Sequence, residues 1–285
     1  MKSRTISGMS ETDGILTKAY SDLLSRSTQQ VGDTLSAAVK VALSPVNIIL
    51  WTFEQATAYA EREVHRILKR RGVSPERIVA PRLEIAGPVI NSFRLPNQPK
   101  ALQELYLNLL ATSMDSITAE SAHPAFVQVV QSLNSQEAQA ISAFVSLNAI
   151  GSPARFPLIE LVAIIESGGE VQVLSRLTNI GTLAGCSSDL PASSIDNFVR
   201  LGLATVHLHL QMQDPHEYDG LRHHPWIAEM KEIAESRPGC KTEVRIGVLE
   251  VTQFGFDFAH ACTGGIECIG LNPVLFCQLP RKRQQ

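Results

Sequence analysis

The sequence is poor in aromatic residues and has no apolar run long enough to cross a membrane. Phe, Trp and Tyr make up 6% of its 285 residues. Its most apolar stretch near the N-terminus, residues 35–51, contains Lys40 and Pro45 and is shorter than the ~20 apolar residues that a spanning helix requires. We therefore expect a cytoplasmic protein, with attachment to the periphery of the inner membrane as a further option.

Cysteine is also sparse, and a secretory signal is lacking. The cysteines are odd in number and lie apart in the second half of the chain, so we expect no disulfide framework. They are Cys186, Cys240, Cys262, Cys268 and Cys277. Residues 1–14 are polar and lack the apolar core of a signal peptide, so we interpret them as a disordered lead-in. Reduced thiols in a cytosol fit both features.

Neither sign of charge dominates the sequence. The net charge of −3 gives no overall attraction to nucleic acid or anionic lipid. A local basic cluster, Arg66, Lys69, Arg70 and Arg71, ends a predicted helix, where cations suit the helix dipole. We favour a solvated helix end. The alternative is a contact with lipid or a partner, shared with the nearby apolar residues Ile48, Ile49, Leu50 and Trp51.

Helical periodicity dominates the first half of the chain. It extends over residues 15–71, where Pro45 is expected to break or kink the pattern. One long helix is expected after this proline, ending before Gly72. Five prolines between residues 73 and 100 predict a connector that contains one short helix in residues 85–94.

Further helices are expected downstream of this connector. They cover residues 101–115, begin at His123-Pro124, and follow the capping box Asn134-x-x-Glu137. Residues 155–166 are expected to form another helix. Residues 167–190 show no clear periodicity and carry no assignment.

The last third alternates between helix and strand patterns. A helix is expected over 191–203, a strand over 204–212 and a second strand over 242–251. An acidic, histidine-rich insertion, residues 213–242, separates the strands and contains a helix. Thr252 is expected to cap a final helix. This order of elements is the plan of a winged helix.

The expected fold is therefore mainly α. An N-terminal helical domain, residues 15–133, includes the proline-rich connector 73–100. A winged-helix-like α+β domain, residues 134–262, carries the insertion 213–242 and is followed by a tail, residues 263–285.

Common catalytic motifs are absent from the sequence. It contains no G-x-x-x-x-G-K-[ST] phosphate loop, no H-E-x-x-H zinc motif and no G-x-S-x-G elbow. We therefore expect no enzyme, no cofactor and no metal. A further hypothesis is a nuclease or metal enzyme around His207 and His209, with His216, His223 and His224 nearby. Because no C-x-x-C pair accompanies these histidines, we interpret them as a polar strand face and loop.

DNA binding is the regulatory alternative for a winged helix, and it requires cations on the recognition helix. The corresponding segment, residues 187–203, offers only Arg200 against Asp189 and Asp196. We therefore do not expect nucleic acid as a partner. A protein partner or self-association is the expected use of the module.

Several segments resemble the abortive-infection alpha family. The most specific are LLATSMD, residues 109–115, and AHPAFVQVVQSLNSQEAQAI, residues 122–141. Segments 41–55, 85–94, 196–206 and 249–262 continue the resemblance, which extends from about residue 31 to residue 262.

The resemblance implies a mostly helical bacterial protein linked to defence in which an infected cell sacrifices itself. The family brings no agreed catalytic residues, so none is carried over. We expect Asp115 to begin a turn and His123-Pro124 to set a helix start. Function is expected to be non-enzymatic defence through protein or membrane contacts.

Overall fold

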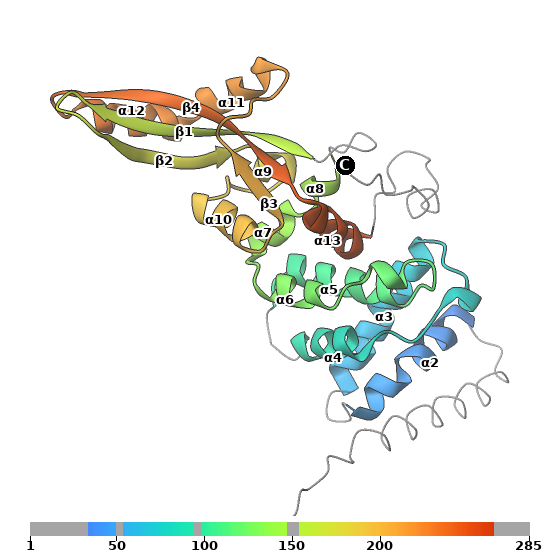
Figure 1. Ribbon diagram of the computed structural model, residues 1–285. Helices are drawn as coiled ribbons and strands as arrows, with labels where there is room; N and C mark the ends of the chain where they lie inside the picture. The colour runs from blue at the N-terminus through green and yellow to red at the C-terminus, as the bar shows by residue number, and fades with distance from the viewer. Residues whose placement is uncertain (1–33, 50–53, 94–97, 147–153, 265–285) are drawn as a thin grey trace, which may run out of the picture. The chain divides into compact units, whose positions relative to one another are not determined.

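The computed structural model describes residues 34–49, 54–93, 98–146 and 154–264 (Figure 1). These residues form two compact units. The first contains the described residues up to Gln98 together with Tyr106–Val127, and the second contains Pro99–Leu105 and the described residues from Gln128 on. The domain limits expected from the sequence, with a boundary after Leu133, stay a prediction.

The first unit is a packing of helices. Apolar side chains three and four residues apart on each helix are buried together, among them Val64, Leu68, Ile85, Val89 and Leu109. Its elements are α2 (Thr34–Ile49), α3 (Glu54–Arg70), η3 (Pro75–Arg77), α4 (Leu83–Ser92), most of α5 (Lys100–Ser113) and η4 (Ala119–Ser121). The short helix expected in residues 85–94 is thus observed as α4.

Pro45 was expected to break or kink the helical pattern. The break is wrong, because α2 continues past this residue to Ile49, and the kink stays a prediction. A proline inside a helix costs about 3 kcal/mol. Leu35, Val39 and Leu43 of α2 are buried, and each such side chain stabilises the fold by about 1.5–3 kcal/mol. Packing in the core therefore offsets the local cost of the proline.

The second unit is built on a four-stranded antiparallel sheet in the order β2-β1-β4-β3. The strands are β1 (Arg155–Ile165), β2 (Glu170–Thr178), β3 (Ala204–His207) and β4 (Cys240–Val251). Figure 1 shows the long strands β1 and β4 side by side. The accompanying helices are most of α6 (Ala125–Gln131), α7 (Ser135–Ala140), α8 (Ala143–Ser146), α9 (Ile180–Leu183), α10 (Ala192–Arg200), η5 (Pro215–Tyr218), α11 (Asp219–Arg222), α12 (Pro225–Glu235) and α13 (Gln253–Thr263).

The expectation of a mainly α fold is corrected by this sheet. Residues 155–166 were expected to be helical but form β1, and the unassigned stretch that follows contains β2. β1 lies between β2 and β4, and its residues Phe156 to Ala163 are buried on both faces. A strand buried on both faces has a continuous apolar run instead of alternation, so its sequence resembles that of a buried helix.

A winged helix is not confirmed. Helix α10, strand β3, the insertion, strand β4 and helix α13 follow in the expected order. However, β3 ends at His207, and the main partner of β4 is β1. The β1–β2 hairpin has no counterpart in the expected plan.

Helix caps were predicted well by local sequence. Asn134 accepts hydrogen bonds from the backbone N–H groups of Gln136 and Glu137, and Glu137 completes the capping box. Thr252 accepts from the N–H of Gly255 at the start of α13. A Cβ atom at Gly255 would lie 2.0 Å from the carbonyl oxygen of Leu203, so only glycine fits there.

The insertion was expected to comprise residues 213–242; its last three residues belong to β4, and the helical part before them packs on one face of the sheet. Its side chains Tyr218, Leu221 and Ile227 form a buried cluster with Ile159 and Leu161 of β1. The Tyr218 hydroxyl donates to the Gly247 carbonyl oxygen at 2.9 Å and accepts from the Met212 N–H at 2.9 Å. α12 runs along β1, β2 and β4 (Figure 1). The insertion is therefore an integral layer of the second unit.

Replacement of Tyr218 by Phe should destabilise the chain by about 1–3 kcal/mol, because the buried Gly247 carbonyl and the partly buried Met212 N–H lose their hydroxyl partner. Urea unfolding followed by circular dichroism measures this change. The control, Ser236→Ala, removes a hydroxyl from an exposed helix end and should change stability by less than about 0.5 kcal/mol. Equal stability of Tyr218→Phe and the unmodified chain would contradict the role given to this hydroxyl.

Candidate functional site

The segment with the most specific family resemblance, residues 109–115, lies at the C-terminal end of α5. Leu109, Leu110, Ala111 and Met114 are fully buried, and Asp115 is 4% exposed. The apolar residues of this segment therefore form core. Its polar residues have to be paired inside the protein, because burial removes them from water.

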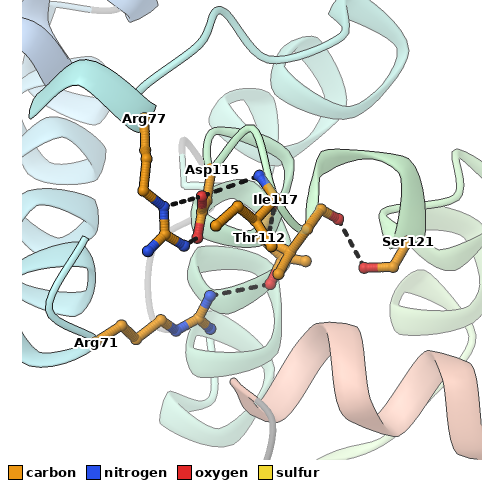
Figure 2. Close-up of polar contacts among 7 residues, drawn as sticks. Arg71, Arg77, Thr112, Asp115, Ile117 and Ser121 are labelled. Atoms are coloured by element: carbon orange, nitrogen blue, oxygen red, sulfur yellow. Dashed lines mark hydrogen bonds and ion pairs between the residues drawn. The ribbon is translucent and has the colours of Figure 1, made fainter. Parts of the chain in front are cut away.

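Asp115 pairs with Arg77, a residue 38 positions earlier in the sequence (Figure 2). The guanidinium donates from Nε to Oδ1 at 3.0 Å and from Nη2 to Oδ2, a bidentate arrangement. Oδ1 also accepts from the Ile117 N–H at 3.1 Å, which forms the turn expected at Asp115. The carboxylate thus fixes both a local turn and a long-range contact.

Backbone hydrogen bonds join the same two segments. The N–H of Val79 donates to the Met114 carbonyl oxygen at 2.9 Å, and the N–H of Ser116 donates to the Arg77 carbonyl oxygen at 2.9 Å. Ile78 and Asp115 form an isolated antiparallel bridge. The end of α5 is therefore held to the segment after η3 by main chain and side chains together.

Arg71 makes a second connection to α5. Its guanidinium donates to Thr112 Oγ1 at 3.0 Å and to Asn108 Oδ1 at 2.9 Å. Figure 2 shows Arg71 and Arg77 reaching the same end of α5. Arg71 is half-buried, whereas Lys69 and Arg70 are exposed. Of the three basic candidates for a partner contact, Arg71 is thus engaged within its own unit.

The apolar candidates for a membrane or partner contact lie at the edge of the described chain. Ile48 and Ile49 belong to the last turn of α2, but their side chains are outside the described residues, as are Leu50 and Trp51 altogether. Within the described ranges, no helix is long and apolar enough to cross a membrane.

The histidines considered for a metal site are placed in separate contacts. The His207 and His209 rings lie 5.7 Å apart, and Thr205 Oγ1 is 3.0 Å from His207 Nε2. His224 Nε2 is 2.9 Å from Asp189 Oδ2, while its Nδ1 accepts from the Trp226 N–H. In the part of the chain that the structure describes, no three His, Cys, Asp or Glu side chains are grouped to hold a metal ion.

His216 and the Cys186 thiol are the titratable groups of interest in the second unit. The pKa of His216 is raised by the hydrogen bond to Asp219, with Oδ2 2.9 Å from Nδ1, and by the charges of Asp219 and Asp214. Burial raises the pKa of the Cys186 thiol. A raised pKa lowers the thiolate fraction, so Cys186 lacks the activation of a catalytic cysteine.

α10, the expected recognition helix, carries little free positive charge. Both Nε and Nη2 of Arg200 donate to Asn197 Oδ1 on the same helix. Asp196 forms an ion pair with Arg176 of β2. Asn197 also donates to Glu137 Oε2 and to the Ser132 carbonyl oxygen, both at 2.9 Å. These contacts tie α10 to its own unit.

Sequence reasoning found part of this site. His123 was expected to set a helix start, and its Nδ1 accepts from the Ala125 N–H at the beginning of α6. Arg77 was missed, and Asp115 was given only its local role. The signal available for Arg77 was its place in the sequence Ser-Pro-Glu-Arg, residues 74–77, inside a supposed connector. Nothing in that pattern specifies a partner 38 residues away.

Removal of either partner of the Asp115–Arg77 pair should destabilise the chain. We expect a loss of about 3 kcal/mol for Arg77→Ala, which leaves the buried Asp115 carboxylate unpaired. The loss for Asp115→Ala should be smaller, because the Arg77 side chain is 34% exposed. The double variant should lose little beyond Arg77→Ala. Urea unfolding of the four proteins measures this coupling. The control is Glu120→Ala, which breaks the exposed Arg82–Glu120 pair at a cost below about 1 kcal/mol. Additive losses at Arg77 and Asp115 would refute the coupling.

Comparison with known proteins gives one family match. The family model described as "Abortive infection alpha" matches residues 53–262. No curated protein matches the chain. A solved structure of an uncharacterized protein from the hydrocarbon-degrading marine bacterium Alcanivorax borkumensis SK2 is 18% identical, covers 48% of this chain and 92% of its own, and has a TM-score of 0.34. A likeness at that TM-score does not establish a shared fold.

The family match contains the buried segment 109–115, its partner Arg77, both helices α3 and α10, and the whole sheet. It agrees with the resemblance carried by LLATSMD and by residues 122–141. The chain belongs to the abortive infection alpha family.

Proposed function

We propose that this protein is a non-enzymatic defence protein of the abortive-infection type, which acts by binding a protein partner or the inner-membrane surface. Membership of the family supports the defence role. The hydrogen bonds of the Asp115 carboxylate support the proposal that the protein is not an enzyme. Both oxygens of this carboxylate accept hydrogen bonds from Arg77, and one also accepts from a backbone N–H.

A catalytic carboxylate needs an approach for substrate and a proton to exchange with it. Asp115 is 4% exposed and faces a guanidinium that keeps its charge in proteins. Thr112, and Asn108 just before the family segment, accept hydrogen bonds from the Arg71 guanidinium. The polar groups of the most specific family segment therefore support a folded framework, and action is assigned to surfaces outside it.

Two kinds of surface are available for such action. The first is the exposed side of α3, which carries Lys69 and Arg70 near its C-terminal end. The apolar residues 48–51 shortly precede this helix in the sequence. The second is the outer side of the insertion, where Trp226 and Ile233 are 39% and 50% exposed. Exposed large apolar side chains of this kind are common at sites of protein contact or self-association.

Expression of the chain in bacteria should protect a culture against phage when few cells are infected at first, and the culture should collapse when nearly all are. This difference arises because abortive infection sacrifices the infected cell. Culture density and phage yield at low and high phage-to-cell ratios measure it. Survival of the culture at both ratios would indicate resistance by another route. Ordinary phage growth at both ratios, across a broad panel, would refute the defence role.

Trp51→Glu should abolish the toxicity of the protein to infected cells while the protein stays folded, because a charge at this position opposes burial in lipid or in a partner. Cell viability after infection and circular dichroism of the purified variant are the two measurements. Val171→Glu, at an exposed apolar side chain of β2 outside both surfaces, is the control for the added charge and should keep full toxicity. Full toxicity of a folded Trp51→Glu variant would remove residues 48–51 from the mechanism.

A further inference from the structure

One side of α3 carries four exposed cations along its C-terminal half. They are Arg62, Arg66, Lys69 and Arg70. Their spacing of four, three and one residues places them on one face of the helix, over about 12 Å of its length. The side chains of Arg62 and Arg66 are 64% and 70% exposed. We call these four residues the basic row. It differs from the cluster expected from sequence in two residues, because Arg71 is hydrogen-bonded within the unit and Arg62 is exposed beside Arg66.

The basic row keeps a net positive charge. Glu63 lies 3.2 Å from Arg62 and 2.6 Å from Arg66, so one half-buried carboxylate serves two guanidinium groups. Glu61 is the other acid on this half of the helix. Among the described residues, Lys69 and Arg70 have no ion-pair partner. Exposed ion pairs are weak, so Arg62 and Arg66 remain available to an external anion.

The opposite side of α3 fixes how this row can be used. Ala60, Val64 and Leu68 are fully buried in the first unit, so the apolar side of the helix cannot insert into lipid. Arg71 holds the end of the helix to α5 through Thr112 and Asn108. α3 therefore presents the cations as a fixed row on a folded body, and binding by this row is electrostatic.

We propose that the basic row of α3 binds the anionic headgroups of a phospholipid membrane, with the helix lying along the membrane surface. This proposal deepens the proposed function by choosing the membrane as the target, and it rests on that function for its biological role. The four cations can each meet a phosphate, because lipid headgroups diffuse and gather around fixed charges. The chain as a whole carries a net charge of −3, so an anionic surface attracts this side of the first unit selectively.

A membrane fits this row better than a nucleic acid does. Nucleic-acid sites combine many phosphate contacts with aromatic or polar side chains that stack on or read the bases. The row spans only about two helical turns. The aromatic ring of Tyr59 lies beneath Arg62, with 5.5 Å between the guanidinium carbon and the ring centre. Tyr59 also packs edge-on against Phe93. This ring is therefore held by contacts within the first unit.

The test uses the purified full chain and sedimentation with vesicles. We expect binding to vesicles of phosphatidylglycerol mixed with phosphatidylcholine, no binding to pure phosphatidylcholine, and weakening as added salt shortens the range of the charges. Each cation is worth about fivefold in the partition coefficient. Lys69→Glu/Arg70→Glu, which changes two residues without ion-pair partners in the described chain, should therefore bind at least about 25-fold more weakly.

The matched control makes the same change of charge on the insertion. Lys231 and Arg237 are exposed in the second unit, and Lys231→Glu/Arg237→Glu should bind mixed vesicles as the unmodified chain does. Equal thermal unfolding of both double variants, followed by circular dichroism, separates loss of binding from loss of fold. A third variant, Arg281→Gln/Lys282→Gln/Arg283→Gln, neutralises the basic end of the sequence and should retain binding through α3.

Four results would overturn the proposal. They are no sedimentation with mixed vesicles, equal weakening by the two charge reversals, loss of binding only in the tail variant, and binding of duplex DNA through Lys69 and Arg70 without binding of vesicles. The phage challenge is separate from this test. If the protein protects cells but does not bind vesicles, only the membrane proposal is refuted. If it binds vesicles but protects no cells, the membrane proposal is retained and the defence role is refuted.

Discussion

The first unit depends on the pairing of a buried carboxylate, Asp115, with the guanidinium of Arg77. Burial makes an unpaired charge costly, so either residue without the other would destabilise the end of α5. The backbone bridge between Ile78 and Asp115 forms at the same place, so side-chain and main-chain contacts support each other. Arg71 adds a neighbouring contact to Thr112. These contacts hold the segment that follows α3 to the end of α5, while the buried side chains Ala60, Val64 and Leu68 set the side of α3 on which its cations are exposed.

The second unit depends on β1, which is buried on both faces between β2 and β4. The insertion covers one side of this strand with Tyr218, Leu221 and Ile227. An acidic, histidine-rich stretch with a strongly polar composition thus contributes core residues at widely spaced positions. Its histidines each have a local task, such as the contact of His224 with Asp189 and the cap that it provides for α12.

The polar groups of the most specific family segment are hydrogen-bonded within the first unit. The search for function is therefore directed to the surfaces of the protein. Asp115 and Thr112 of this segment, and Asn108 just before it, accept hydrogen bonds from Arg71 or Arg77, which follow α3 closely in the sequence. The cations that remain exposed on α3 are therefore a more direct lead to the target than the family segment itself. The proposed contact function requires a stable body and a charged or apolar surface, and this division of residues is compatible with both.

The sequence by itself determined the elements whose signals are local. The capping box at Asn134 and Glu137, the cap at Thr252, the helix start at His123 and the strand 242–251 were all predicted, because each depends on neighbouring residues or on simple alternation. The resemblance carried by LLATSMD likewise lay in the sequence, and the family match agrees with it. Only the tertiary structure decided that residues 155–165 form a strand, since an apolar run buried on both faces has no distinguishing period. The same holds for the choice of Arg77 as the partner of Asp115 and for the inward turn of Arg71, because pairing across 38 or 41 residues is set by packing in space and leaves no mark on local sequence.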